Sequence, residues 1–129
     1  MRRIVLDAPA MLALTRREQG ADKVAEILAE SVMSTVTLSE AVGYYARSGA
    51  SQAEIRALFD VLRIERVPFD GELAYIAGLL LPKTRAAGLS FGDRACLALA
   101  LQMSAKVLTA DRAWLRIAAA VGVEIELIR

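Results

Sequence analysis

Short apolar runs alternate along this chain with longer segments in which apolar residues recur at helical spacing. The runs have the length of buried strands, and two of them end directly at Asp7 and Pro68. The last run alternates with Glu124 and Glu126, which is typical of a half-exposed strand. Strands are therefore predicted at residues 4–6, 32–37, 64–67, 106–109 and 123–127.

The segments between these runs predict helices. The clearest is amphipathic, with Ile55, Leu58, Phe59 and Leu62 at i, i+3, i+4 and i+7. Residues 90–103 are apolar nearly all round, which predicts a buried helix. Further helices are predicted at residues 9–20, 24–28, 38–46, 73–80 with Pro82 as a break or kink, and 113–121 ended by Gly122.

Strands and helices in regular alternation indicate an α/β fold with a mostly parallel central sheet. Right-handed crossovers place helices on both faces of such a sheet, giving a three-layer α/β/α sandwich. The 129 residues suit one domain, and no linker or repeat divides them. A single domain over residues 1–129 is expected.

Composition narrows the possible chemistry. The hydrophobic share of 56% argues against disorder, and a net charge of +1 provides no large basic field to hold a nucleic acid. The absence of histidine excludes Ser-His-Asp and Cys-His catalysis and histidine-bound zinc. Cys96 lies among apolar residues and is expected in the core. No apolar stretch approaches the ~20 residues of a membrane span, so a cytoplasmic protein is expected.

Four acidic residues stand at corresponding places along the chain: Asp7, Glu40, Asp93 and Asp111. Three of them follow a strand-like run and open a helix-like run, and Asp93 opens the buried helix. The carboxyl ends of parallel strands share one edge of a sheet, so these side chains are expected to converge. Two charges about 4 Å apart repel by roughly 4 kcal/mol at an effective dielectric near 20. Such a cluster therefore needs a cation.

Carboxylates without histidine or cysteine suit a hard cation, Mg²⁺ or alternatively Mn²⁺. Two such ions about 3.5–4 Å apart would clamp the attacking and leaving oxygens of a phosphodiester. Thr109 could add a hydroxyl to this site. Arg94 and Arg112 each follow a site acid and are candidate phosphate contacts, although solvated helix residues are the preferred interpretation of both.

Each acid also has a purely structural explanation, because acidic side chains cap helix N-termini. Residues 37–40 match the capping-box pattern, residues 90–93 match it loosely, and Asp111 fits a simple cap. Asp7 either caps its helix or, since Pro9 suits the first helical turn, lies outside it with a free carboxylate. The edge that the four residues share is what favours a site over unrelated caps.

Four blocks of sequence resemble the PIN-domain ribonucleases, in particular the small VapC toxins of VapBC-type toxin–antitoxin pairs. The blocks are residues 5–8 (VLDA), 35–41 (TVTLSEA), 88–100 (GLSFGDRACLALA) and 107–114 (VLTADRAW). The last two are the specific ones. The resemblance implies an α/β/α sandwich, a homodimer, and a Mg²⁺- or Mn²⁺-dependent endoribonuclease that cleaves RNA and inhibits translation. It also implies that Asp7, Glu40, Asp93 and Asp111 are the catalytic, metal-binding quartet.

The resemblance further implies an antitoxin partner, bound in a groove of the helices around residues 38–62. Tyr44 and Tyr45 would belong to that groove, or else serve as packing or dimer contacts. One position departs from the family pattern: many members carry Ser or Thr two residues after the first Asp, where this chain has Pro9.

Two other hypotheses stay open at this point. A receiver-type signalling module also gathers acids at a sheet edge, but it usually has an acidic pair early in the chain, and Asp7 has no acidic neighbour. A catalytically inactive PIN-like binding protein would use its acids only as caps, and Mg²⁺ or Mn²⁺ would not stabilise it.

Overall fold

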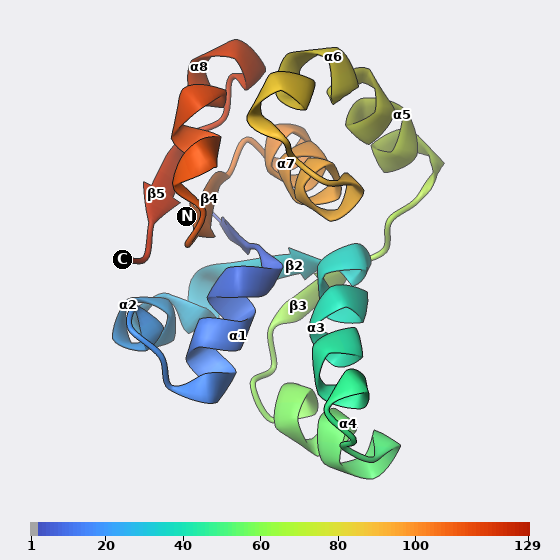
Figure 1. Ribbon diagram of the computed structural model, residues 1–129, viewed down its shortest axis with the longest axis vertical. Coiled ribbons are helices and arrows are strands. Elements are labelled where there is room, and N and C mark those ends of the chain that lie inside the picture. Colours follow the sequence, from blue (N-terminus) through green and yellow to red (C-terminus); the bar gives the residue numbers. More distant parts are fainter. Residues whose placement is uncertain (1–2) are drawn as a thin grey trace.

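A parallel sheet forms the centre of the computed structural model, which describes residues 3–129 (Figure 1). Within these residues the strand order is β3-β2-β1-β4-β5, and all neighbouring strands run parallel. The strands are β1 (Ile4–Leu6), β2 (Ser31–Ser34), β3 (Glu65–Val67), β4 (Lys106–Thr109) and β5 (Ile125–Leu127). The sequence predicted both the strands and their parallel arrangement.

The helices connect successive strands and cover both faces of the sheet, with α1 and α2 on one side and α5 to α8 on the other (Figure 1). They are α1 (Ala8–Arg16), α2 (Ala21–Glu26), α3 (Thr35–Arg47), α4 (Gln52–Asp60), α5 (Gly71–Leu79), α6 (Leu81–Thr84), α7 (Phe91–Met103) and α8 (Ala118–Val121). Short 3₁₀ turns stand at η1 (Leu28–Glu30), η2 (Arg85–Ala87) and η3 (Arg112–Arg116).

Alternation along the strands divides the core into two apolar clusters. Val5, Val32 and Val107 point toward the cluster built by α5, α7 and α8. Leu6 and Met33 join the opposite cluster, to which α1, α2, α3 and α4 contribute. The three predicted layers are therefore present, with β1 and β4 buried on both faces.

The second strand and the helix after it differ from the prediction. Strand β2 ends at Ser34, and residues 35–37 form the first turn of α3 instead of extending the strand. The Ser34 hydroxyl caps this helix by accepting a hydrogen bond from the Val36 amide at 3.1 Å, so the predicted capping box at residues 37–40 is wrong. The β-branched residues Thr35, Val36 and Thr37 imitate a strand, but the Ser34 cap starts the helix before them.

Two predicted helices also form in pieces. Residues 24–28 are divided between α2 and η1, and residues 113–121 between η3 and α8. The buried helix is confirmed as α7, and its thiol Cys96 is buried in the core, where burial raises the pKa of the thiol. No helix within residues 3–129 has the length and apolar character needed to cross a membrane.

Candidate active site

Asp7 stands where β1 ends and α1 begins. Its Oδ1 accepts a hydrogen bond from the Ala10 amide at 2.8 Å, so it caps the helix. Its Oδ2 is buried and has no hydrogen-bond partner within residues 3–129. Burial raises the pKa of Asp7 to about 7, and the charges of Asp93 and Asp111 add to this, although the Thr109 hydroxyl and the Ala10 amide act against it. Asp7 thus caps α1 through Oδ1, and its Oδ2 remains available to a ligand.

Thr109 and Asp111 are linked at the end of β4. Thr109 is fully buried, and its hydroxyl accepts a hydrogen bond from the Asp111 amide at 3.0 Å. The exposed side chain of Asp111 caps η3 by accepting from the Ala113 amide at 2.9 Å. Thr109 therefore holds the turn that carries Asp111, and its hydroxyl also lies close enough to Asp7 to lower the pKa of that carboxyl.

Asp93 enters the site from the first turn of α7. It forms a capping box with Ser90, in which Asp93 Oδ2 accepts from the Ser90 amide at 2.9 Å and Ser90 Oγ accepts from the Asp93 amide at 3.2 Å. The box confirms the pattern seen in the sequence and fixes the orientation of the carboxylate. Burial raises the pKa of Asp93, as does the charge of Asp111, while the Ser90 hydrogen bonds and Arg94 act in the opposite direction.

Glu40 lies in the second turn of α3, one turn further into the helix than the sequence suggested. Its carboxylate packs against the backbone of Gly92 at the start of α7, so closely that a β-carbon at position 92 would overlap with it. Burial raises the pKa of Glu40, and the charge of Asp93 adds to this. Gly92 is therefore a site residue that sequence reasoning missed, and its position directly before Asp93 was the available signal.

The four acids lie close enough for their charges to interact, but their carboxylates do not surround a common point as metal ligands would. Asp93 raises the pKa of both Asp7 and Glu40, and Asp111 raises that of Asp7 and Asp93. Within residues 3–129, however, no three Asp, Glu or Cys side chains stand around a common point as ion ligands would. Three of the carboxylates are instead oriented by the helix N-termini that they cap.

The residues present fit a divalent cation. The buried Asp7 Oδ2 has no hydrogen-bond partner among the described residues, and a buried polar atom of this kind normally has one. Its carboxyl is also raised in pKa by two neighbouring acids, so a positive charge would relieve both the burial and the repulsion. With oxygen ligands alone, the donor set suits Mg²⁺ or Mn²⁺.

The two candidate phosphate-binding arginines differ in their surroundings. The guanidinium of Arg94 lies 5.9 Å from the centre of the Phe91 ring, its Nε is buried with no hydrogen-bond partner among the described residues, and its charge lowers the pKa of Asp93. Arg112 is exposed beside Asp111. Arg94 is thus coupled to the acids, whereas Arg112 matches the solvated residue that the sequence suggested.

A groove of about 460 Å³ opens from the acids along the seam between α1 and α3. Residues from three helices line it: Ala8, Pro9, Leu12, Glu40, Gly43, Tyr44, Arg47 and Asp93. We call this the α1–α3 groove. Pro9 forms part of its apolar wall.

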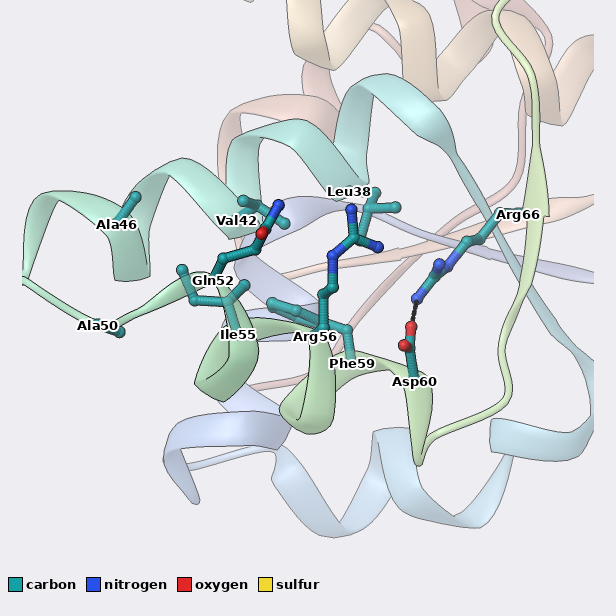
Figure 2. A pocket seen from close by; sticks show the side chains of 10 residues that line it. All are labelled: Leu38, Val42, Ala46, Ala50, Gln52, Ile55, Arg56, Phe59, Asp60 and Arg66. Carbon is teal, nitrogen blue, oxygen red and sulfur yellow. Dashed lines mark hydrogen bonds and ion pairs between the residues drawn. The ribbon is translucent and has the colours of Figure 1, made fainter.

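A second groove of about 350 Å³ lies between α3 and α4, and Figure 2 shows its apolar floor with Arg56 and the Arg66–Asp60 ion pair along its rim. We call it the α3–α4 groove; it is lined by Leu38, Val42, Ala46, Ala50, Gln52, Ile55, Arg56, Phe59, Asp60 and Arg66. Neither Tyr44 nor Tyr45 lines this groove, and Tyr45 is the packing residue that the sequence left open as an alternative. Tyr44 lines the α1–α3 groove, and Tyr45 packs edge-on against Phe59 with its hydroxyl 2.6 Å from that of Thr15.

The sequence model of the PIN domain family matches residues 4–120, which includes all four acids. The chain therefore belongs to the PIN domain family, as its sequence blocks suggested. Membership in the PIN domain family excludes the hypothesis of a receiver-type signalling module.

Among curated proteins, none matches the sequence. Solved structures match its fold over nearly its whole length. A DNA-bound VapBC from Salmonella typhimurium is 19% identical, with a TM-score of 0.77 and coverage of 100% of both chains. A toxin–antitoxin complex from Klebsiella pneumoniae is 16% identical, with a TM-score of 0.71 and coverage of 98% of both. VapBC-5 from Mycobacterium tuberculosis is 22% identical, with a TM-score of 0.63 and coverage of 100% of this chain and 99% of the other.

Proposed function

We propose that this protein is a metal-dependent endoribonuclease and the toxin of a toxin–antitoxin pair, which arrests translation by cutting RNA. The observation that carries the proposal is the buried Oδ2 of Asp7, which has no hydrogen-bond partner within residues 3–129 and lies among three further acids at the carboxyl edge of the sheet. The similarity in fold to VapBC proteins supports the toxin assignment.

Asp7, Glu40, Asp93 and Asp111 would hold Mg²⁺ or Mn²⁺. A bound divalent cation supplies positive charge to the scissile phosphodiester and increases the acidity of the attacking water. Neighbouring residues orient these acids. Ser90 hydrogen-bonds Asp93, and the Thr109 hydroxyl accepts a hydrogen bond from the amide of Asp111. Gly92, which has no side chain, leaves the space that the carboxylate of Glu40 occupies. Arg94, beside Asp93, stands where it can offset the charge of the phosphate.

The decisive experiment compares two capping-box acids. Asp93 and Glu54 occupy the same N3 position of a box, in α7 and in α4, and only Asp93 belongs to the site. Asp93→Asn and Glu54→Gln proteins would be incubated with labelled tRNA and rRNA fragments in Mn²⁺, Mg²⁺ or EDTA. We expect discrete cuts that need the metal, persist in Glu54→Gln and disappear in Asp93→Asn.

Equal cutting by both variants would expose a contaminating nuclease and contradict the assignment. The inactive binding protein is the second candidate, because three of the acids already serve as caps. That candidate predicts no cutting and no rise in melting temperature with Mn²⁺, whereas an ion at about 100 times its dissociation constant adds about 2.7 kcal/mol to the free energy of unfolding.

The α3–α4 groove would bind the antitoxin. Its floor is apolar, and Ile55 and Phe59 within it are buried. An amphipathic helix lays its apolar face into a groove of this kind, and the cation Arg56 on the rim suits an acidic side chain along the edge of that helix.

This assignment can be tested with Ala46→Arg, because Ala46 lines the groove and is exposed, so the variant is expected to fold. Co-purification with a candidate antitoxin should be lost, and RNA cleavage retained. Ala119→Arg, which adds the same charge at an exposed alanine of α8, serves as the control. An unchanged complex with Ala46→Arg would place the antitoxin elsewhere.

A second copy of the chain would cover α5. Tyr75 and Leu79 are each 74% exposed on this helix, and between them lies Gly78, where an added β-carbon would meet nothing within 4 Å. Glu72 stands at one end of the exposed face and Lys83 beyond the other. Two copies related by a two-fold axis would bring Gly78 to the crossing point and set each Glu72 toward the other copy's Lys83.

Sedimentation of the parent and of Leu79→Arg tests this face. The parent should sediment as a dimer and the variant as a monomer with an unchanged circular dichroism spectrum. Leu115→Arg is the matched control, since Leu115 is also exposed, at 47%, but lies on η3. A variant that remains dimeric would exclude α5 as the interface.

A further inference from the structure

The two ends of the α1–α3 groove carry opposite charge. Asp93 and Glu40 lie at one end, and Arg47 lies two turns along α3 at the other, a rise of roughly 10 Å from Glu40. The wall between them is uncharged and is formed by Pro9, Leu12 and Gly43. A ligand that spans this groove would meet a cation-binding end and an anion-binding end.

The basic end holds two arginines and an aromatic ring. Arg47 is exposed and has no ion-pair partner within residues 3–129. The guanidinium of Arg16 lies 5.0 Å from the centre of the Tyr44 ring, and its Nη1 contacts Glu18 at 3.1 Å. Tyr44 thus lines the groove together with Arg47, while the guanidinium of Arg16 lies over its ring and Tyr45 packs edge-on against it. A free cation next to an aromatic ring suits a phosphate with a neighbouring base.

Gly43 provides a second, independent observation. It lies in the middle of α3 and is exposed, and a β-carbon there would meet nothing within 4 Å. Glycine at such a position destabilises a helix by roughly 0.5–1 kcal/mol relative to alanine, and no contact within the described residues requires it. The position lies in the wall of the groove, where a missing side chain lets a ligand approach the helix backbone.

We propose that the α1–α3 groove binds single-stranded RNA next to the cleavage site, with Arg47 on the phosphate that neighbours the scissile one. Tyr44 then supports the adjoining base, and Gly43 allows the strand to lie close to α3. The proposal rests on the proposed ribonuclease function and deepens it, since it makes Arg47 a positioning residue for substrate. A single strand is required because only unpaired bases can turn toward such a surface.

The test measures binding separately from cutting. Fluorescence anisotropy of a labelled single-stranded RNA would be recorded across a salt series, with Ca²⁺ in place of Mn²⁺ and the RNA checked for integrity afterwards. Loss of one phosphate contact should lower the slope of log K against log salt by about 0.7 for Arg47→Ala. Arg63→Ala, an exposed arginine at the amino edge of β3, removes the same charge and should leave the slope as in the parent.

A set of RNAs, each with one phosphate replaced by a neutral methylphosphonate, locates the contact. One replacement should weaken binding about 3- to 10-fold in the parent and leave binding by Arg47→Ala unchanged. In the cleavage assay, Arg47→Ala should raise KM by the same factor with kcat within about twofold. Gly43→Ala should raise the melting temperature and yet raise KM, two effects that a purely structural role would not combine.

The outcomes distinguish a failure of the groove proposal from a failure of the proposed ribonuclease function. If no cleavage depends on Asp93, the ribonuclease itself is wrong. If cleavage depends on Asp93 but Arg47→Ala and Arg63→Ala have the same salt slope and KM, the groove proposal alone is overturned. Retained RNA binding by Arg47→Ala with loss of antitoxin binding would also overturn it, and would assign the groove to the protein partner.

Discussion

The carboxylate of Glu40 occupies the space that a side chain at Gly92 would fill. This contact joins α3 to the first turn of α7 and sets Glu40 beside Asp93. In Gly92→Ala the added methyl group must push Glu40 away from the acids. We expect kcat/KM for RNA cleavage to fall about 100-fold, as expected for a misplacement of about 1 Å, while the free energy of unfolding changes by less than about 1 kcal/mol because the end of a glutamate can move.

Gly71→Ala is the matched control for this substitution. Gly71 also stands in the first turn of a helix, and a β-carbon there would meet nothing within 4 Å. Its kinetics should equal those of the parent. Full activity in Gly92→Ala, measured in the same assay, would show that the position of Glu40 does not matter for cleavage.

The raised pKa of Asp7 makes the stability of the protein depend on pH. The unfolded carboxyl ionises near 3.8 and the folded one near 7, so between these values the native state holds a proton that the unfolded state has released. The free energy of unfolding therefore falls as pH rises through this window and levels off above it, by an amount on the order of 4 kcal/mol. In metal-free buffer, Asp7→Asn should remove this fall.

Denaturant unfolding at pH 4 and at pH 8 measures the effect. The parent and Asp7→Asn should have nearly equal stability at pH 4, and the variant should be more stable at pH 8. An asparagine still accepts the hydrogen bond from the Ala10 amide, so loss of the cap does not confuse the comparison. If the variant were less stable than the parent at pH 8, ionised Asp7 would not destabilise the native state, and the prediction would be wrong.

The sequence predicted most of this architecture because β1, β4 and α7 are apolar enough to be recognised locally. It predicted the shared edge for the same reason, since Asp7 follows β1 directly and Asp111 follows β4 after one residue. Glu40 was harder to place, because Thr35, Val36 and Thr37 read as strand although Ser34 caps them into helix. Local propensity cannot resolve such a case, since the choice between strand and helix depends on the cap and on packing.

Contacts between segments far apart in the chain could not be predicted from the sequence patterns. The space left at Gly92 depends on how α3 meets α7, and the α1–α3 groove depends on how α1 meets α3. The rings of Tyr44 and Tyr45 pack edge-on against each other, yet Tyr44 lines the α1–α3 groove and Tyr45 packs against the core. Neither relationship has a periodic signal in the chain.

Thr109 is expected to tune the site from within the core. Its hydroxyl accepts from the Asp111 amide and lowers the pKa of Asp7. Thr109→Val keeps the shape of the side chain and removes both interactions. The pKa of Asp7 should rise further, so the pH at which cleavage reaches half its maximum should move upward. The Asp111 amide, part-buried and without its acceptor, should cost about 1 kcal/mol of stability.

The pH profile separates these two consequences. Thr84→Val also removes a buried hydroxyl, one that donates to the Leu80 carbonyl at 2.9 Å and is not among the causes of the raised pKa of Asp7, Glu40 or Asp93. It should lower the melting temperature without moving the pH profile. An unmoved profile in Thr109→Val would mean that Thr109 supports the fold alone.

Metal binding should release a proton from Asp7. A divalent cation binds the ionised carboxylate, and at pH 6 most Asp7 side chains carry a proton because their pKa lies near 7. The apparent association constant for Mn²⁺ should therefore fall about tenfold for each pH unit below 7 and change little above 8. Titration calorimetry at pH 6, in two buffers that differ in ionisation enthalpy, should report close to one proton released per ion bound.

In Asp7→Asn the proton release should vanish together with most of the affinity for Mn²⁺. An Mn²⁺ affinity that is constant between pH 6 and pH 8 would mean that the ion binds without Asp7, and the remaining acids would then have to account for the site.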